Sequence, residues 1–133
     1  MEKEYKNTHK SIAKVIQETR IPFHKWIRYR DANRECISCG TTASKIWDAG
    51  HYFKAEIYSG MIFNEKNVHK QCRKCNTFLG GNEREYRKGL IARYGEQYVL
   101  HLEARAIEMR SYKYSRTELN DIKLKYLNNL KTI

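Results

Sequence analysis

The sequence predicts an α+β fold in which helices at both ends flank a short zinc-clamped core. Apolar residues recur at helical spacing near the N-terminus and again in the last fifty residues. The middle third is punctuated by glycine and contains all four cysteines, as two Cys-x-x-Cys pairs. For a chain of 133 residues we expect one domain, 1–133. Its parts would be an N-terminal helical segment (1–31), the zinc-clamped core (32–82) and C-terminal helices (83–133).

Helix signals are clear before the first cysteine. Residues 8–19 carry apolar side chains at helical spacing, and Thr8 is available as an N-cap. Pro22 suits the first turn of a second helix, where its missing N–H is not needed. The two stretches could instead form one kinked helix.

The middle third should contain two short strands. The first contains WDAGHYF, residues 47–53, and the second is GMIFN, residues 60–64. The segment between them is expected to be a loop. A short helix should follow Cys75 and end at Gly80 and Gly81.

The last third is predicted to be helical. Asn82 and Glu85 have the spacing of a cap side chain and a glutamate that share unpaired amides, and Gly95 would end that helix. A second segment follows Gly95, and Ser115 with Glu118 should open the last helix. Its apolar stripe would complete the core or form a homodimer contact; the stripe consists of Leu119, Ile122, Tyr126 and Leu130.

The cysteines Cys36, Cys39, Cys72 and Cys75 predict a structural zinc site. Zinc takes four ligands at tetrahedral corners, and a two-residue gap lets one tight turn supply two thiolates. Two disulfides fit poorly with an N-terminus that lacks a secretion signal. A redox dithiol would be a single pair near a βαβ pattern, which the sequence lacks. The 32 residues between the pairs exceed the roughly 15 to 20 of a simple zinc ribbon, so the ion should clamp a hairpin.

Charge and hydropathy favour a polyanionic partner and exclude a membrane span. The net charge is +11, and each third of the chain contains more Lys and Arg than Asp and Glu. Such a surface gains affinity for DNA or RNA by releasing counterions. The mean hydropathy is −0.82, and no apolar run approaches the about 18 residues that a membrane span needs. We therefore expect a cytoplasmic protein.

One histidine has the setting expected of a catalytic group. His51 lies at the end of a predicted strand between the cysteine pairs. A neutral imidazole can deprotonate water near pH 7, and phosphodiester hydrolysis also needs a cation to absorb charge. Mg²⁺ prefers oxygen ligands, and Asn76, directly after Cys75, can offer one. His69 is a weaker candidate for the base.

The order Cys-x-x-Cys, Gly-His, Asn-x-x-x-x-Cys-x-x-Cys-Asn resembles the zinc-containing HNH, or ββα-metal, nucleases. The resemblance implies that His51 is the general base and that Asn76 binds the catalytic metal, Mg²⁺ or Mn²⁺. It also implies that Asn67 pins the loop or the backbone of His51. Many HNH enzymes have an acidic residue directly before the histidine, where this chain has Gly50.

Asp48 is the nearest carboxylate to His51 and is a possible second magnesium ligand. Side chains alternate along a strand, so Asp48 and His51 should point to opposite faces unless the strand is bulged. The Asp-x-Gly-His order also resembles nonspecific ββα-metal nucleases, in which an asparagine is the only protein ligand of the metal. The other role open to Asp48 is a hydrogen bond that orders the loop.

A closer resemblance is to the phage NinG (Rap) recombination-protein family. It covers about residues 20 to 127, and it is carried by CISCG, WDAGHY, FNEKNVHKQCRKCN, GGN and YRKGLIARYG. Members of this family act on branched DNA, and the longer ones have an extra N-terminal cysteine-rich stretch that is absent here. The resemblance places the protein in the cytoplasm of a bacterial host.

The leading hypothesis is a metal-dependent endonuclease of branched recombination intermediates such as Holliday junctions, leaving 5′-phosphate and 3′-hydroxyl ends. Symmetric resolution of a four-way junction needs two active sites, which a homodimer would supply. A non-catalytic, zinc-stabilised DNA-binding module is the alternative. Phosphate contacts, or plain surface charges, are expected on the helix after the cysteines, at Arg84, Arg87, Lys88 and Arg93.

Overall fold

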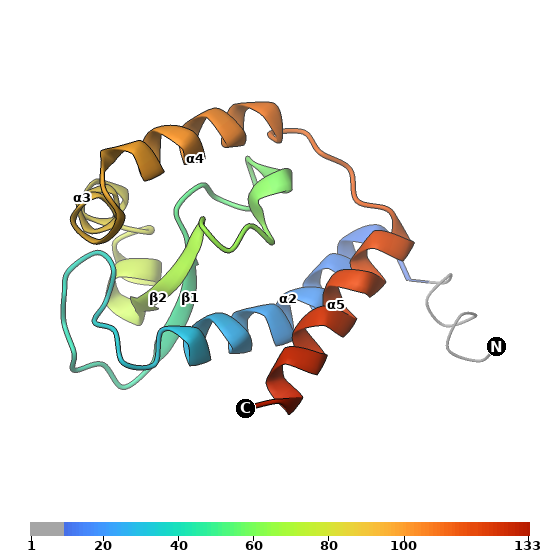
Figure 1. Ribbon diagram of the computed structural model, residues 1–133, viewed down its shortest axis with the longest axis horizontal. Helices are drawn as coiled ribbons and strands as arrows, with labels where there is room; N and C mark the ends of the chain where they lie inside the picture. Colours follow the sequence, from blue (N-terminus) through green and yellow to red (C-terminus); the bar gives the residue numbers. More distant parts are fainter. Residues whose placement is uncertain (1–9) are drawn as a thin grey trace. The chain divides into compact units, whose positions relative to one another are not determined.

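The computed structural model describes residues 10–133 and contains two compact units (Figure 1). The described part of the first unit is residues 10–26 together with 113–133, and the second unit is residues 27–112. Within the described residues the fold is mixed, with helices and one two-stranded sheet. The expected single domain, with boundaries at 31 and 82, stays a prediction.

The first unit is built on two helices. Helix α2 spans Ile12–Arg30, and its last turn lies in the second unit. Pro22 lies inside α2, so the two predicted helical stretches form one helix, which was the second of the two possibilities. Ser11 begins it, because its Oγ accepts a hydrogen bond from the Lys14 amide at 3.1 Å. The predicted cap, Thr8, lies outside the described residues.

Helix α5 spans Arg116–Lys131 and packs on α2 through aromatic rings. The rings of Phe23 and Tyr126 meet edge to face, with centroids 4.9 Å apart, and Trp26 lies 5.3 Å from Tyr126. The Glu118 amide donates to Ser115 Oγ at 3.1 Å, which confirms the predicted start of this helix.

The sheet of the second unit is an antiparallel hairpin of β1 (Trp47–His51) and β2 (Val68–Cys72) (Figure 1). Its register pairs Trp47 with Cys72 and His51 with Val68. The predicted strand at 60–64 is wrong. Residues Ser59–Met61 form the 3₁₀ helix η1.

Backbone hydrogen bonds explain why η1 is not a strand. The Ser59 and Gly60 amides donate to the carbonyl oxygens of Arg110 and Met109, at 3.1 and 2.9 Å. A Cβ at Gly60 would lie 2.3 Å from the Met109 carbonyl oxygen, so only glycine fits this approach. The backbone amides of Ser59 and Gly60, which a strand would use for pairing, are therefore bonded to the residues just after helix α4 (Glu96–Glu108).

Helices α3 (Glu83–Tyr94) and α4 (Glu96–Glu108) enclose the core of this unit (Figure 1). Gly95, at φ +92°, separates them as predicted. Their buried apolar side chains pack with η1 and with the segment between the first cysteines; the buried cluster is Ile37, Met61, Tyr86, Leu90, Val99, Leu102 and Ala106. A Cβ at Gly89 would lie 1.8 Å from the Ile37 carbonyl oxygen, so α3 lies directly against that segment.

Helix α3 starts after Asn82 as predicted, but the predicted side-chain cap is wrong. Asn82 has left-handed backbone angles (φ 44°, ψ 54°), and its side chain makes no capping hydrogen bond. It donates instead to Cys75 Sγ at 3.4 Å. Two glycines with positive φ, Gly80 and Gly81, come just before it. They follow the short helix Lys74–Phe78, which agrees with the predicted end, although the helix contains Cys75 and does not start after it.

The last turn of α2 is fastened to β2 by charged groups. Arg30 forms a two-bond ion pair with Asp31 and donates to the carbonyl oxygens of Glu65 and Val68 at 2.9 and 2.8 Å. Asp31 also accepts from the Lys70 amide at 3.0 Å. Asp31 is only 3% exposed, so removing Arg30 would leave a buried charge without its partner and would destabilise the fold. None of the helices in the described part of the chain has the length and apolar character needed to cross a bilayer.

A second polar network is buried beneath β1. The Tyr86 hydroxyl donates to the Gly50 carbonyl oxygen at 2.7 Å, and His69 Nδ1 lies 3.1 Å from the same hydroxyl. Since the single hydroxyl proton goes to Gly50, Nδ1–H of His69 donates to Tyr86. Burial, with a smaller contribution from the positive charge of Arg30, lowers the pKa of His69 to about 3. His69 is therefore neutral in the folded protein near pH 7.

This burial predicts a pH dependence of stability. Below pH 6.5 the unfolded chain protonates His69, whereas the folded chain does not until about pH 3. The unfolding free energy should therefore fall with decreasing pH in that window, by up to about 1.4 kcal/mol per pH unit from this group. Urea unfolding of native protein and of His69→Gln, at pH 7.5 and 5.5 with zinc held constant, measures the difference. Parallel losses of stability in both proteins would contradict a buried neutral His69.

Candidate functional site

Four cysteine sulfurs lie together beside the open end of the hairpin. The Sγ atoms of Cys36, Cys39, Cys72 and Cys75 are all within 4.8 Å of one another. Cys39 Sγ and Cys72 Sγ are 3.8 Å apart, far longer than the about 2 Å of a disulfide. Four thiolates about 2.3 Å from a central zinc would be roughly 3.8 Å apart. These four close cysteines could hold a metal such as zinc.

Each pair is shaped by its own tight turn. In the first, the Gly40 amide donates to the Cys36 carbonyl oxygen at 3.0 Å, and Gly40 has φ +76°. The second begins as β2 ends at Cys72 and continues into η2, the π-helix Lys74–Phe78. Backbone amides also point at sulfur, because the Cys72 amide donates to Cys36 Sγ at 3.4 Å. The cluster thus joins the segment before β1 to the end of β2.

The surroundings shift the pKa values of two cluster thiols in opposite directions. Burial raises the pKa of the Cys75 thiol to about 12, so a nearby positive charge is needed to keep it as a thiolate. Burial alone would also raise the pKa of Cys36. Amides of Cys39, Cys72 and Ser38 instead hold that pKa below its usual value.

Asp48 and Asn76 lie side by side next to the cluster. Asn76 Nδ2 donates to Asp48 Oδ2 at 3.1 Å. Arg73 Nε and Nη2 donate to the two oxygens of the same carboxylate, at 2.7 and 2.9 Å. Burial alone would raise the pKa of Asp48, but the bonds from Arg73 and Asn76 hold it below its usual value. Because the Asn76 NH₂ group is bound to Asp48, its carbonyl oxygen faces away from that carboxylate.

His51 is the last residue of β1. Its Nε2 lies 3.0 Å from the Ile62 carbonyl oxygen. A carbonyl oxygen can only accept, so Nε2 carries the proton and Nδ1 is the basic nitrogen of the neutral ring. The strand pairing is regular from Trp47 to His51, so Asp48 and His51 point to opposite faces of the hairpin.

Asn67 is fully buried and closes the loop between the strands. Its Oδ1 accepts from the Phe53 amide at 2.8 Å, and its Nδ2 donates to the carbonyl oxygens of Phe53 and Met61 at 3.1 and 3.0 Å. The carbonyls of the consecutive residues Met61 and Ile62 are therefore bound by Asn67 and His51. These bonds couple the start of β2 to the end of β1 through η1.

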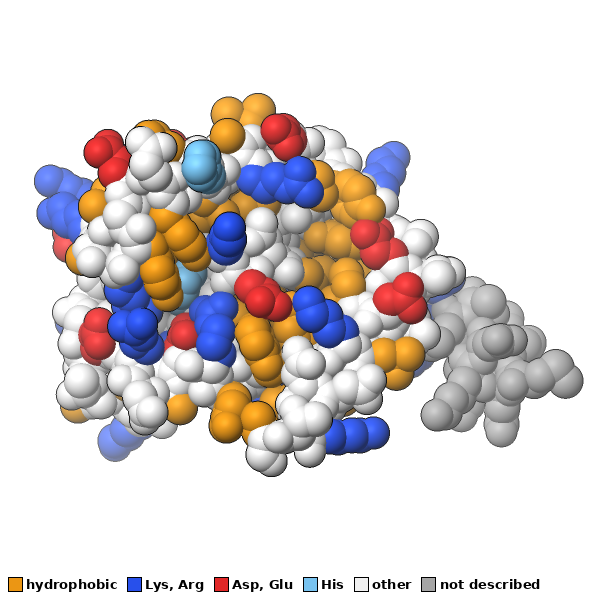
Figure 2. Space-filling view, in the orientation of Figure 1, with side chains coloured by type: hydrophobic (Ala, Val, Ile, Leu, Met, Phe, Trp, Pro, Cys, Tyr) orange, Lys and Arg blue, Asp and Glu red, His pale blue; other side chains and the backbone are white. Residues whose placement is uncertain are grey.

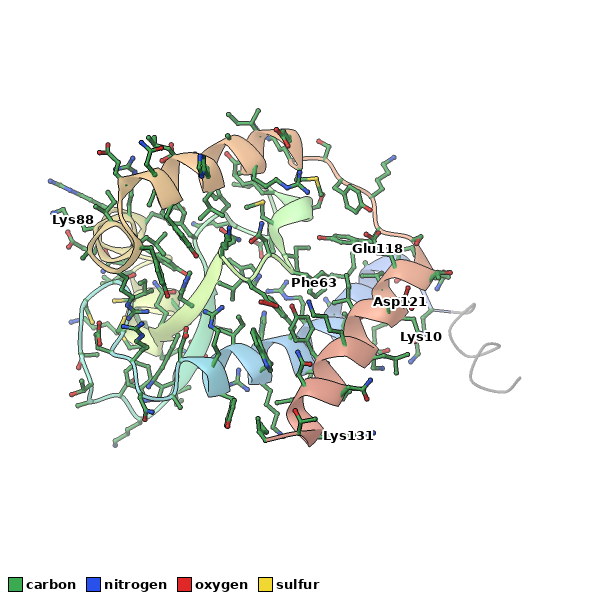
Figure 3. The ribbon with its side chains drawn as sticks, in the orientation of Figure 1. Lys10, Phe63, Lys88, Glu118, Asp121 and Lys131 are labelled. Atoms are coloured by element: carbon green, nitrogen blue, oxygen red, sulfur yellow. The ribbon has the colours of Figure 1, made fainter. Side chains whose placement is uncertain are left out.

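The four candidate DNA contacts on α3 differ in exposure. Arg84 is exposed, and Lys88, with its side chain 62% exposed, extends outward from the helix (Figure 3). Arg87 is half-buried and pairs with Glu103 at 3.1 Å. The Arg93 side chain is only 8% exposed and donates to the Glu35 carbonyl and carboxylate oxygens. On the face shown in Figure 2, Lys and Arg side chains lie beside Asp and Glu side chains.

Two residues of this site were missed at the sequence level. Arg73, inside the second Cys-x-x-Cys, holds Asp48, and Asn82 donates to a cluster sulfur. The contact between Arg73 and Asp48 could be predicted only with the strand register in hand. In that register Asp48 pairs with Gln71, two residues before Arg73. Asn82 has no sequence signal for its contact, since its spacing to Glu85 favoured a helix cap.

Metal removal tests the cysteine cluster. We expect one zinc per chain, and we expect Cys75→Ser or chelation to unfold residues 27–112, because the cluster joins segments far apart in the chain. Atomic absorption gives the zinc content, and circular dichroism during heating gives the stability. Thr42→Ala changes an exposed residue between the pairs and should alter neither. An unchanged melting curve after complete zinc removal would show that the metal is not structural.

Comparison with known proteins identifies the family. The family model described as "Bacteriophage Lambda NinG protein" matches residues 1–133. "Protein ninG" of Escherichia phage lambda is 37% identical over 118 residues, covering 89% of this chain and 56% of the relative. "Protein ninG" of Salmonella phage P22 is 36% identical over 118 residues, with 89% and 57% covered. No solved structure matches the chain. The chain thus spans little more than half the length of these curated relatives, and it belongs to the bacteriophage lambda NinG family.

Proposed function

We propose that this chain is a metal-dependent endonuclease that hydrolyses phosphodiester bonds in branched DNA, with residues 32–82 acting as an HNH (ββα-metal) core. The observation that carries the proposal is the setting of Asn76. It directly follows a cluster cysteine, its NH₂ group is held by Asp48, and its oxygen is left for a cation. An amide oriented in this way suits Mg²⁺ or Mn²⁺, which take oxygen ligands and keep several waters.

His51 is the proposed general base. Its proton lies on Nε2, where Ile62 accepts it, so Nδ1 can take a proton from the attacking water. Attack at phosphorus opposite the 3′ oxygen would leave a 5′-phosphate and a 3′-hydroxyl. A divalent cation on Asn76 would supply positive charge to the phosphate and the departing 3′ oxygen. Asn67 would keep the segment that orients His51 in place.

Asp48 is proposed as a positioning residue and not as a metal ligand. Both of its oxygens accept from Arg73, so a cation bound there would displace a two-bond ion pair. Its bond to Asn76 sets which face of the amide is available. The sequence left both roles open, and these contacts favour the ordering role.

The substrate would be held by basic side chains of α3. Arg84 and Lys88 are exposed and Arg87 is half-buried, which suits phosphate contacts. Arg93 is left out of this set because its guanidinium is buried against Glu35. Symmetric cutting of a four-way junction would require two copies of the chain, and a phage protein with this substrate would work in the host cytoplasm.

Cleavage of labelled DNA tests the proposal. Native protein, His51→Ala, Asn76→Ala and the exposed-histidine control His101→Ala are compared on a four-way junction and on a linear duplex of the same sequence, with Mg²⁺, Mn²⁺ or EDTA. We expect metal-dependent cutting that favours the junction. Loss of the base or of the ligand should lower the rate by about 10² or more. His101→Ala should cut normally.

Each other outcome selects a different conclusion. Cutting by His51→Ala at the native rate would exclude His51 as the base. Tight junction binding without cleavage under any metal would favour the alternative, a zinc-stabilised DNA-binding module. Equal cutting of junction and duplex would keep the hydrolytic chemistry and remove the specificity for branched DNA.

A further inference from the structure

Two adjacent apolar side chains project into solvent just after the proposed metal ligand. Phe78 is 79% exposed and Leu79 is 50% exposed. Phe78 lies two residues after Asn76 and is the last residue of η2. We call Phe78 and Leu79 the apolar tip. Single exposed apolar residues are common, so exposure alone carries no function.

The apolar tip is held rigidly at its base. The Leu79 amide donates to the Lys74 carbonyl oxygen at 2.9 Å, and the Gly81 amide donates to the Cys75 carbonyl oxygen at 2.8 Å. Gly80 has φ +59°, and a Cβ there would meet no atom within 4 Å, so the turn beyond Phe78 lies in open space. A ring on such a turn gives up little conformational freedom when it binds, because the backbone is already fixed.

Three basic side chains lie near the apolar tip, and two of them are paired with carboxylates. Lys74 is exposed, whereas Arg73, whose side chain is 43% exposed, is bound to Asp48. Lys54, in the loop after β1, has its Cε 3.8 Å from a Cβ placed at Gly81 and its Nζ 3.8 Å from Glu83 Oε1. The surface of two exposed side chains is too small to form a stable protein–protein interface by itself. An aromatic ring flanked by cations is instead the combination that stacks on a nucleic-acid base while phosphates are neutralised.

We infer that Phe78 stacks on a base left unpaired or unstacked at the branch point of the DNA, and that this contact selects branched DNA over linear duplex. The inference rests on the proposed function and adds a specificity-determining residue to it. A fully stacked duplex offers no base face to the ring, whereas a strand exchange point that has been opened does. Because the tip follows Asn76 in the same short helix, stacking would place a phosphate near the branch at the proposed metal ligand.

Fluorescence of 2-aminopurine at the branch point tests the inference. Proteins carrying His51→Ala, which should bind without cutting, are titrated into labelled junction and into linear duplex. We expect quenching on binding to the junction. Adding Phe78→Ala should abolish the quenching and weaken junction binding about tenfold, with duplex binding unchanged. Adding Phe78→Tyr should preserve both effects. Ile107→Ala, which removes an equally exposed (78%) apolar side chain on α4, should also preserve both.

Equal zinc content and equal melting temperatures in all variants show that the fold is intact. Unchanged quenching and junction affinity in Phe78→Ala would overturn the inference and leave the proposed function standing. Equal weakening on junction and duplex would overturn it too, because the ring would then be a general contact. A change of oligomeric state on sedimentation of Phe78→Ala would assign the tip to a second copy of the chain. A parent protein that binds neither DNA would instead defeat the proposed function.

Discussion

The convergence of four cysteine sulfurs is the interaction on which the second unit depends. It joins a turn at residues 36–39 to one at residues 72–75, with the whole hairpin between them. The two-stranded sheet is short, and a lone hairpin is only marginally stable in water. A metal such as zinc at the cluster would supply the missing cross-link. Asn76 is the next residue after the last cysteine, so its position would depend directly on that cross-link.

Around this centre, buried polar bonds take the place of a large sheet. Arg30 and Asp31 hold β2 from one side, and Tyr86 bonds the backbone of β1 at Gly50 from α3. Asn67 and His51 both bind carbonyl oxygens next to η1. Such networks are costly when broken, because a buried group left without a partner loses its hydration. They give a small hairpin the rigidity that the proposed base and metal ligand would require.

Sequence patterns with a local cause were predicted well, and those set by distant contacts were not. The cysteine spacing, the glycine ends of η2 and α3 and the Ser115 cap all depend on residues a few positions apart. The strand expected at 60–64 failed because its backbone bonds to the end of α4, nearly fifty residues later. Asn82 matched a capping pattern, but its side chain donates to the sulfur of Cys75. The ordering role of Asp48 could be chosen only from its ion pair with Arg73, which the structure shows. The roles proposed for His51, Asn67 and Asn76 draw on family resemblance, because spacing alone could not assign them.

In the proposed function, the cysteine cluster presents the Asn76 oxygen to a divalent cation. Paramagnetic broadening by Mn²⁺ tests it most directly, in zinc-loaded His51→Ala protein bound to junction DNA and observed by NMR. We expect Mn²⁺ to broaden the side-chain amide of Asn76 and the backbone amides beside it. Asn76→Ala should remove the local broadening. Sharp Asn76 signals at saturating Mn²⁺, in protein that retains its zinc, would contradict the claim.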